Sequence, residues 1–365
     1  MNTSARQRFL SYVRRTSDSA HIVSPFLPHP EVVRSTLSWL HLPATGDVVA
    51  DEIALSKHLG YEPMFMTDCA GLIFNWEIDE ARSSETVATR VIRTSRGEWV
   101  RTSPREEIPW SDESGCPVIT SHDHAMLVAA CEQVGLQEQA IREYFRTWRE
   151  RVGEDGVIVM GHPHPAWLGY QISPSNIFYQ WNDLRDAYAR SMHAVFEASL
   201  FVMSIALEEG IDFMSDSSYG LEMTSPALFA AMDMPHIRAF SSWTHDHGSL
   251  FWYHNCGFTR QMIADGTFNT LGVDVLETIA PPPEGDNELA AARQALDPGI
   301  CSKGNLNLTL LRDGSPEQIT AEVAAIARAV RGSAHILSTA DAVLPGTSPE
   351  NFVTFIAAAR AAAGS

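Results

Sequence analysis

The sequence is poor in basic residues. It has 26 Lys and Arg against 45 Asp and Glu, and its formal net charge is −19. Nucleic-acid backbones and anionic membrane surfaces attract proteins with positive patches, and so acidic a chain has no surplus of positive charge to supply one. We therefore expect neither nucleic acid nor a membrane among its partners.

Long apolar runs and a secretory leader are also missing. The longest apolar stretch, Phe196 to Leu207, is too short to span a bilayer and contains Glu197. The first residues, MNTSARQRFLSYVRRT, lack the apolar segment of a signal peptide. These features predict a cytoplasmic protein whose five cysteines are thiols rather than disulfides.

Four familiar site motifs do not occur. Neither G-x-G-x-x-G nor G-x-x-x-x-G-K-[ST] is present, which argues against a glycine-rich phosphate loop, and there is no G-x-S-x-G and no C-x-x-C. What is present is a chain of 365 residues, 45% of them apolar, which is enough for a large hydrophobic core.

From about residue 120, short apolar runs alternate with longer amphipathic segments. This alternation predicts parallel strands joined by crossover helices. Seven strands are expected: Pro63–Thr67, Val157–Gly161, Ile211–Ser215, Leu250–Tyr253, Val273–Glu277, Gly299–Ser302 and His335–Thr339. With Pro117–Thr120 as a candidate eighth strand, the pattern favours an α/β fold of the (β/α)₈ TIM-barrel class. A doubly wound open sheet is the alternative, but the glycine-rich loop that usually follows its first strand is absent.

We expect one domain over residues 1–365, in three parts. Residues 1–60 form a helical N-terminal cap, with helices over Ala5–Arg15, Glu31–Leu40 and Asp51–Leu59. Residues 72–108 form a β insertion of short antiparallel strands, Leu72–Asp79, Thr86–Thr94 and Glu98–Thr102, and residues 110–365 form the main barrel.

The active site of such a barrel lies at the carboxyl ends of its strands. His254 and Cys256 follow a predicted strand and are two residues apart, so both side chains can share one ion. Imidazole and thiolate together favour zinc, which needs three protein ligands at a catalytic site. Cys301 and Asp341, after later strands, are the candidates for the third ligand, and Cys69 is a further one.

Other strand ends supply candidates for catalysis and binding. Asp216 follows a strand and is a candidate general acid or base, unless it only caps a loop. His162 and His164 directly follow the strand that ends at Gly161 and would border the barrel mouth. Candidates for contact with a substrate or cofactor are Asp68, Cys69, His164 and Tyr219.

The C-terminal third carries Gly304-Asn-Leu306, then Gly314-Ser-Pro-Glu317, then the run Leu344-Pro-Gly-Thr-Ser-Pro-Glu-Asn351. Before it come Asp216, Ser225-Pro226, His245-Asp-His-Gly248 and His254-Asn-Cys-Gly257. In order and approximate spacing, these motifs resemble the uroporphyrinogen decarboxylase (URO-D) superfamily, which includes zinc-dependent corrinoid methyltransferases. The resemblance covers the chain from about residue 150 to its end, and it implies a (β/α)₈ barrel.

The resemblance points to the methyltransferase branch. The decarboxylases carry an arginine-rich motif after the first strand, whereas this chain reads Met64-Phe-Met-Thr-Asp-Cys-Ala-Gly71, with no arginine. The methyltransferases hold zinc with an H-x-C pair like His254 and Cys256. Their third ligand is typically a Cys near the last strand, where this chain has Asp341, so either Asp341 or Cys301 takes that place, with a slight preference for the softer Cys301.

The resemblance therefore implies a zinc-dependent methyltransferase or demethylase. It would move a methyl group between a small O-, S- or N-methyl substrate, or a thiol acceptor, and a corrinoid supplied by a partner protein or as free cofactor. Asp216, with His245 or His162, would handle protons, and the chain would form a homodimer. The alternatives are a metal-free, decarboxylase-like lyase that depends on Asp216, and a non-catalytic barrel that binds a tetrapyrrole-like ligand.

Overall fold

The structure is a computed structural model that describes residues 3–16, 21–105, 120–161, 176–218 and 220–364. The chain divides into two compact units by its internal contacts. The first unit comprises residues 1–67, 147–159 and 211–365, and the second comprises residues 68–146 and 160–210. The prediction of a single domain stays a prediction.

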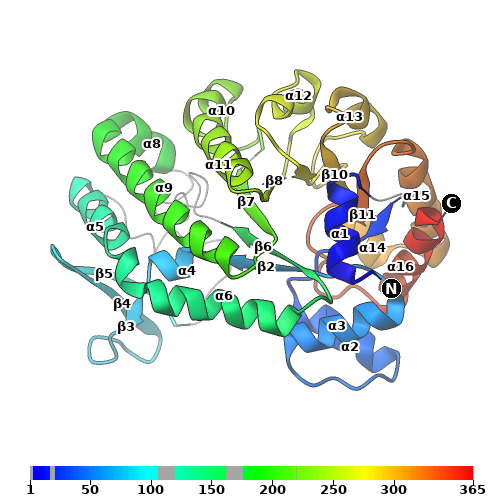
Figure 1. The fold of residues 1–365 in the computed structure, drawn as a ribbon, viewed down its shortest axis with the longest axis horizontal. Coiled ribbons are helices and arrows are strands. Elements are labelled where there is room, and N and C mark those ends of the chain that lie inside the picture. The colour runs from blue at the N-terminus through cyan, green and yellow to red at the C-terminus, as the bar shows by residue number, and fades with distance from the viewer. Residues whose placement is uncertain (1–2, 17–20, 106–119, 162–175, 219, 365) are drawn as a thin grey trace. The chain divides into compact units, whose positions relative to one another are not determined.

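A curled, parallel sheet of eight strands organises the fold (Figure 1), in a TIM-barrel-like arrangement. In spatial order the strands are β1 (Ile22–Val23), β11 (His335–Thr339), β10 (Cys301–Leu306), β9 (Val275–Glu277), β8 (Leu250–Asn255), β7 (Phe213–Ser218), β6 (Val157–Gly161) and β2 (Met64–Asp68). The Glu62 amide donates to the Val23 carbonyl at 2.8 Å, so the chain entering β2 also touches β1, at the other end of the order.

The seven strands expected from the sequence are confirmed, and the candidate eighth, Pro117–Thr120, lies outside the described residues except for Thr120. The eighth position is taken by β1, a strand of two residues beside β11. Thr120 instead caps the following helix, with its side chain accepting a hydrogen bond from the Asp123 amide, and residues 117–119 lie outside the described part of the chain. Two apolar residues are too few to show a strand period, so the sequence signal for β1 was lost.

Helices of the first unit precede the sheet and alternate with its strands. They are α1 (Ala5–Val13), α2 (Pro30–Trp39), α3 (Val48–Leu59), α10 (Pro226–Met232), α11 (Met234–Asp246), α12 (Arg260–Ala264), α13 (Leu289–Ala295), α14 (Leu308–Asp313), α15 (Pro316–Ala329) and α16 (Pro349–Ala363). Several begin at the residue that the sequence marks: Ser225, Ser315 and Ser348 each cap a helix that has proline in its first turn.

The core of the first unit fills the amino-terminal half of the sheet's interior. Phe9 and Tyr12 of α1 pack in one cluster with Phe213, Trp252 and Cys301 of three different strands. The Tyr12 hydroxyl also bonds both the amide and the carbonyl of the first residue of β11, at 2.9 and 2.8 Å. Helix α1 therefore packs at the amino ends of the strands, which leaves the carboxyl ends for the site.

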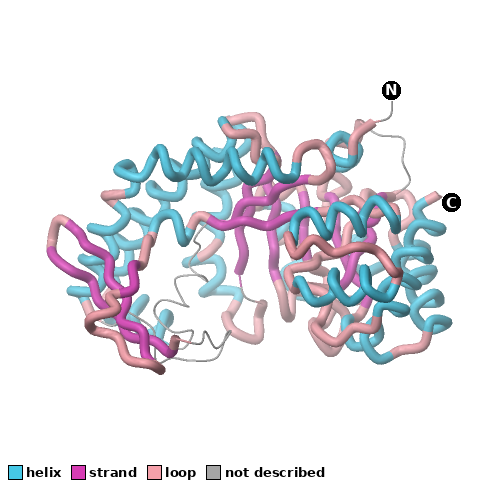
Figure 2. The backbone as a smooth tube through the Cα atoms, turned by 90° about the horizontal axis from the view of Figure 1, so that it is seen from below, coloured by secondary structure: helices cyan, strands magenta, loops and turns pink. Residues whose placement is uncertain are grey.

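The second unit contains a separate antiparallel sheet, drawn in magenta in Figure 2. Its strands are β3 (Glu77–Ile78), β4 (Val87–Thr94) and β5 (Gly97–Pro104), and its helices are α4 (Ala70–Ile73), α5 (Ser121–Cys131), α8 (Asn176–Asp183) and α9 (Arg185–Glu208), while α6 (Glu138–Val152) runs from this unit into the first. The predicted strand over residues 72–79 is partly wrong, because α4 occupies its first residues. Within the part of the chain described, α9 alone is long and apolar enough to cross a membrane, and half of its most apolar window is buried in the protein.

Candidate active site

Four side chains with metal-binding atoms meet at the carboxyl ends of β8, β9 and β11. His254 is the fifth residue of β8, and strand register places it beside Glu277, the last residue of β9. The His254 Nδ1 atom lies 3.5 Å from Glu277 Oε2, and its Nε2 atom lies 3.9 Å from Asp341 Oδ2. The Cys256 side chain hydrogen-bonds the same imidazole. One imidazole is thus surrounded by a thiol and two carboxylates.

This arrangement favours positive charge at His254. Burial opposes the charged imidazole, but its hydrogen bonds to Cys256 and Glu277 and the charge of Asp341 outweigh burial and raise the pKa of His254 well above its usual value. The site therefore stabilises a cation between its acidic groups, either a proton on His254 or a bound metal ion.

Glu277 was not among the site residues predicted from the sequence, although it closes one of the predicted strands. Its side chain is fully buried, accepts a hydrogen bond from Trp252 Nε1 at 2.8 Å and forms an ion pair with the equally buried Lys303 of β10. Burial would raise the pKa of Glu277, but the charge of Lys303 and the contact with His254 lower it, so the carboxylate is ionised. The available signal was a carboxylate at the end of the predicted strand Val273–Glu277, the position at which His254 and Asp341 were recognised.

Among the residues that the structure describes, no group of three or more His, Cys, Asp or Glu side chains is placed so that it could hold a metal ion as it stands. The donor types nevertheless fit zinc: a nitrogen, a sulfur and a carboxylate oxygen are the atoms that zinc takes in proteins. The electrostatics fit as well, because the group stabilises a positive charge at its centre. By the type of their donor atoms, His254, Cys256 and Asp341 are the candidate ligands for such an ion.

Cys301 does not lie at the strand mouth where the sequence analysis placed it. It is the first residue of β10, is fully buried and belongs to the hydrophobic cluster of α1 and the strand interiors. Its register partner is Val275, two residues before Glu277. Cys301 is therefore one layer of side chains below His254, and burial raises the pKa of its thiol to about 12. This position corrects the preference for Cys301 as third ligand. The predicted strand, Gly299–Ser302, placed Cys301 near a strand end, but β10 begins at Cys301 and continues to Leu306.

Asp216 also departs from its predicted place. In β7 it pairs with Tyr253, whereas Ser217 pairs with His254. Since neighbouring side chains of a strand point to opposite faces, Asp216 points away from the face that carries His254. It is buried, and its pKa is raised well above the usual value by burial, with Asp233 adding to the shift. The lyase alternative, which depends on Asp216 at the mouth, loses its support.

Asp233 makes stability depend on pH. Burial raises its pKa to about 8, so the folded protein holds a proton there that the unfolded chain releases at about pH 4. The stabilisation from this proton is complete below about pH 4 and is lost as the pH rises to about 8, with a slope of up to about 1.4 kcal/mol per pH unit. Urea unfolding across this range should show a smaller decline in Asp233→Asn than in the unmodified protein. Identical slopes in the two proteins would contradict this prediction.

His245 lies at the other end of the strands. It sits in the last turn of α11, and its Nε2 atom is 2.7 Å from Asp274 Oδ2, which also accepts a hydrogen bond from the Phe251 amide at 2.7 Å. Phe251 is the second residue of β8, so His245 is near the amino end of the strand whose carboxyl end carries His254. Its predicted role in proton transfer at the mouth is therefore wrong. Helix α11 directly precedes β8, so the last turn of the helix, which carries His245, lies near the amino end of the strand.

The remaining predicted residues belong to the second unit or lie outside the described residues. Asp68 ends β2, and the buried Cys69 precedes α4, with its amide donating to the Gly161 carbonyl at 3.0 Å. His162, His164 and Tyr219 fall outside the residues that the structure describes. Their roles stay predictions.

Comparison with known proteins agrees with the motifs. The family profile described as uroporphyrinogen decarboxylase (URO-D) matches residues 139–362. A methyltransferase from Methanosarcina mazei is similar in structure, with a TM-score of 0.65, 16% identity and coverage of 99% of both chains. A B12-independent methionine synthase from Shewanella has a TM-score of 0.47 and 9% identity over 94% of this chain and 95% of its own. No curated protein matches the chain.

At these identities the structural similarity shows the fold alone, and it agrees with the eight-stranded sheet described above. The family profile, in contrast, rests on the sequence and spans more than half of the chain. The motifs from Asp216 to Asn351 lie within the matched range. The chain therefore belongs to the uroporphyrinogen decarboxylase family.

Proposed function

We propose that this protein is a zinc-dependent methyltransferase that moves a methyl group between a small O-, S- or N-methyl substrate, or a thiol acceptor, and a corrinoid. The observation that carries the proposal is the group of donors around His254, with Cys256, Glu277 and Asp341 at the carboxyl ends of the strands. Active sites of TIM-barrel enzymes lie at this end. Methyltransferase is also the name of the structural neighbour from Methanosarcina mazei.

We assign the zinc ligands to His254 Nε2, Cys256 Sγ and an Asp341 oxygen. Zinc bound there would act as a Lewis acid on the heteroatom that gives or receives the methyl group, and would lower the pKa of a bound thiol. Three protein ligands leave a fourth position for that heteroatom. Asp341 is 32% exposed, so this side of the site is open to solvent.

Glu277 acts in this proposal as the residue that orients His254. It faces Nδ1, so it favours the imidazole with its proton on Nδ1 and leaves the lone pair of Nε2 on the side of Asp341. Carboxylates commonly hold zinc-ligating histidines in this way. Lys303 and Trp252 fix the carboxylate in turn, so the orientation of His254 depends on the whole buried group.

The corrinoid would come from a partner protein or as free cofactor, and the chain would work as a homodimer. These parts of the proposal rest on the family branch that the motifs resemble. No residue of the described chain is assigned to the corrinoid or to a dimer contact.

The reaction can be tested by mixing zinc-loaded protein with methylcobalamin and a simple thiol, 2-mercaptoethanol, and following the loss of methylcobalamin absorbance. The reverse reaction uses reduced cobalamin and a methyl thioether. We expect turnover in one direction, and a loss of at least about a hundredfold in Cys256→Ser, because the zinc ligand set is broken. Cys301→Ser is the matched control and should keep its activity. Equal loss in both variants, or methyl transfer that persists in Cys256→Ser, would contradict the proposal.

A further inference from the structure

The turn that carries Cys256 is held by the loop that follows β7. Strand β8 ends at Asn255, so Cys256 is the first residue beyond the strand. Two residues later, the Phe258 amide donates a hydrogen bond to Glu222 Oε2 at 2.7 Å. The Phe258 carbonyl accepts a hydrogen bond from the Leu221 amide at 2.9 Å. Both backbone groups of Phe258 are therefore bound by residues between β7 and α10.

The next two residues of the turn are held by the loop that follows β9. Asp286 Oδ1 accepts hydrogen bonds from the amides of Thr259 and Arg260, both at 3.0 Å. The buried Asn287 side chain donates to Thr259 Oγ1 at 2.7 Å. Because β7 and β9 flank β8 in the sheet, a carboxylate reaches the turn from each side. Of the two carboxylates, that of Glu222 binds nearer to Cys256 along the chain.

The packing against Glu222 leaves no space for a side chain at Gly257, the residue after Cys256. Gly257 has φ of +84°, in the left-handed region that favours glycine. A Cβ atom at this position would overlap the Glu222 carboxylate. On Gly220, a Cβ atom would lie only 2.8 Å from the Cys256 carbonyl oxygen. The loop that carries Glu222 therefore packs directly on the backbone of Cys256 and Gly257.

The two residues of the H-x-C pair are fixed by different means. His254 lies within β8, where pairing with Ser217 of β7 and Glu277 of β9 sets its place. Cys256 lies beyond the last residue of β8, so its position depends on the turn. A site on a loop is held less precisely than one on a strand, unless further contacts fix the loop. Glu222 supplies such a contact.

We propose that Glu222 is a positioning residue for Cys256. Its carboxylate binds the Phe258 amide, and so fixes the turn and keeps the Cys256 thiol beside His254. The proposal rests on the proposed function, because it takes Cys256 as a zinc ligand. Glu222→Gln keeps a side-chain oxygen that accepts from the Phe258 amide, whereas Glu222→Ala removes it. The two variants separate the hydrogen bond from the charge.

Cobalt(II) bound in place of zinc tests the position of the thiol, because a cobalt–thiolate bond gives a charge-transfer absorption in the near ultraviolet. Chelator-treated protein is titrated with cobalt(II), and its zinc affinity is measured by competition with a chelating dye. We expect Glu222→Ala to bind zinc at least about tenfold more weakly and to lose much of the cobalt–thiolate absorption. Glu222→Gln should retain both.

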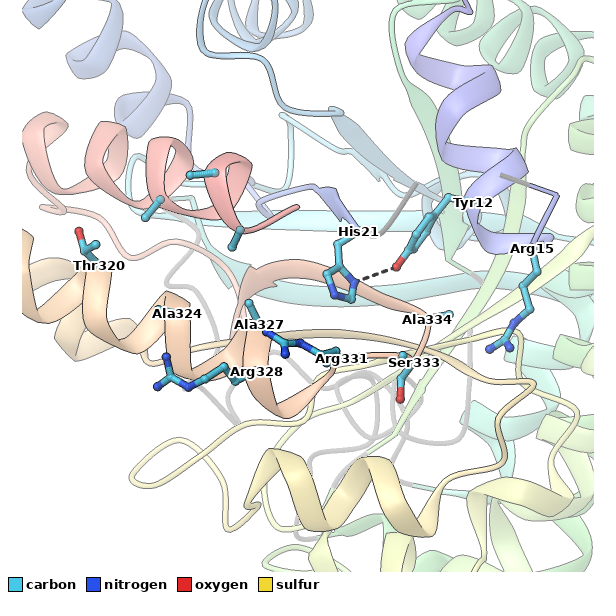
Figure 3. Close-up of a pocket in the computed structure, with 14 residues that line it drawn as sticks. Tyr12, Arg15, His21, Thr320, Ala324, Ala327, Arg328, Arg331, Ser333 and Ala334 are labelled. Carbon is cyan, nitrogen blue, oxygen red and sulfur yellow. Dashed lines mark hydrogen bonds between the residues drawn. The ribbon is translucent and has the colours of Figure 1, made fainter. Parts of the chain in front are cut away.

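Glu322→Ala is the matched control. Glu322 is exposed on α15, and Thr320 and Ala324 of the same helix line a cavity at the amino end of β11, beside Tyr12 and His21 (Figure 3). The candidate zinc site lies at the carboxyl ends of the strands. The removal of this glutamate should therefore leave both the zinc affinity and the cobalt–thiolate absorption unchanged.

Hydrogen exchange of the Phe258 amide in metal-free protein reports the contact itself. We expect exchange to be at least about tenfold faster in Glu222→Ala than in the unmodified protein, and little changed in Glu222→Gln, because the amide loses its acceptor only in the first. Equal exchange in Glu222→Ala and the unmodified protein would overturn the proposal.

Three further outcomes would count against the proposal. Faster exchange in Glu222→Ala with unchanged zinc affinity and cobalt absorption would show that Glu222 holds the turn without positioning Cys256. A loss of zinc affinity in Glu222→Gln as large as in Glu222→Ala would show that the hydrogen bond is not the cause. No cobalt–thiolate absorption in the unmodified protein would overturn the proposed function, and the positioning role with it.

Discussion

Protein purified without chelator is expected to hold about one zinc ion per chain, and Cys256→Ser and Asp341→Ala are expected to lose it. Both side chains are donors beside His254, and a site with three protein ligands keeps little affinity when one is removed. Elemental analysis of the purified variants measures this directly. Glu277→Gln should keep zinc but bind it about tenfold to a hundredfold more weakly, because Glu277 orients His254.

Cys301→Ser is the decisive control for the zinc prediction. Cys301 is a thiol of the same chain, but it is buried one layer below the site and should leave the zinc content unchanged. If Cys301→Ser loses zinc and Asp341→Ala keeps it, the third ligand is wrongly assigned. If the unmodified protein holds no zinc even after reconstitution, the proposed function fails.

The second large effect is expected on stability, from Lys303→Met. Lys303 and Glu277 are both fully buried, and the substitution removes the lysine partner of the Glu277 carboxylate, which is left with the more distant His254 imidazole at 3.5 Å. An ion buried without its partner typically costs about 3–5 kcal/mol of the free energy of unfolding. Urea unfolding of chelator-treated protein measures the loss, because bound zinc would otherwise add its own stabilisation.

Two variants separate charge from size in this experiment. The double variant Lys303→Met with Glu277→Gln should regain most of the lost stability, since neither member of this buried pair is then charged. Lys57→Met removes one partner of an exposed pair, with Asp155, and should change stability by about 0.5 kcal/mol or less. A loss in Lys303→Met no larger than that in Lys57→Met would show that the buried pair contributes nothing.

Much of the fold could be predicted because its signals are local. Each of the seven short apolar runs predicted as strands is a strand, and serine followed by proline begins helices α10, α15 and α16. The exception, β1, is too short to carry a period and is held by its pairing with β11. The pair His254 and Cys256 was also predictable, because two residues of one strand end need no knowledge of the rest of the chain.

The sequence by itself determined the strand and helix alternation, the family and one half of the candidate zinc site. Only the tertiary structure decided which distant residues lie beside that half of the site. Strand pairing sets the register between strands, and the register sets which side chains share a face of the sheet. Strand register places Glu277 beside His254 and Cys301 one layer of side chains lower. Asp216 pairs with Tyr253 rather than with His254, so its side chain points to the other face of the sheet.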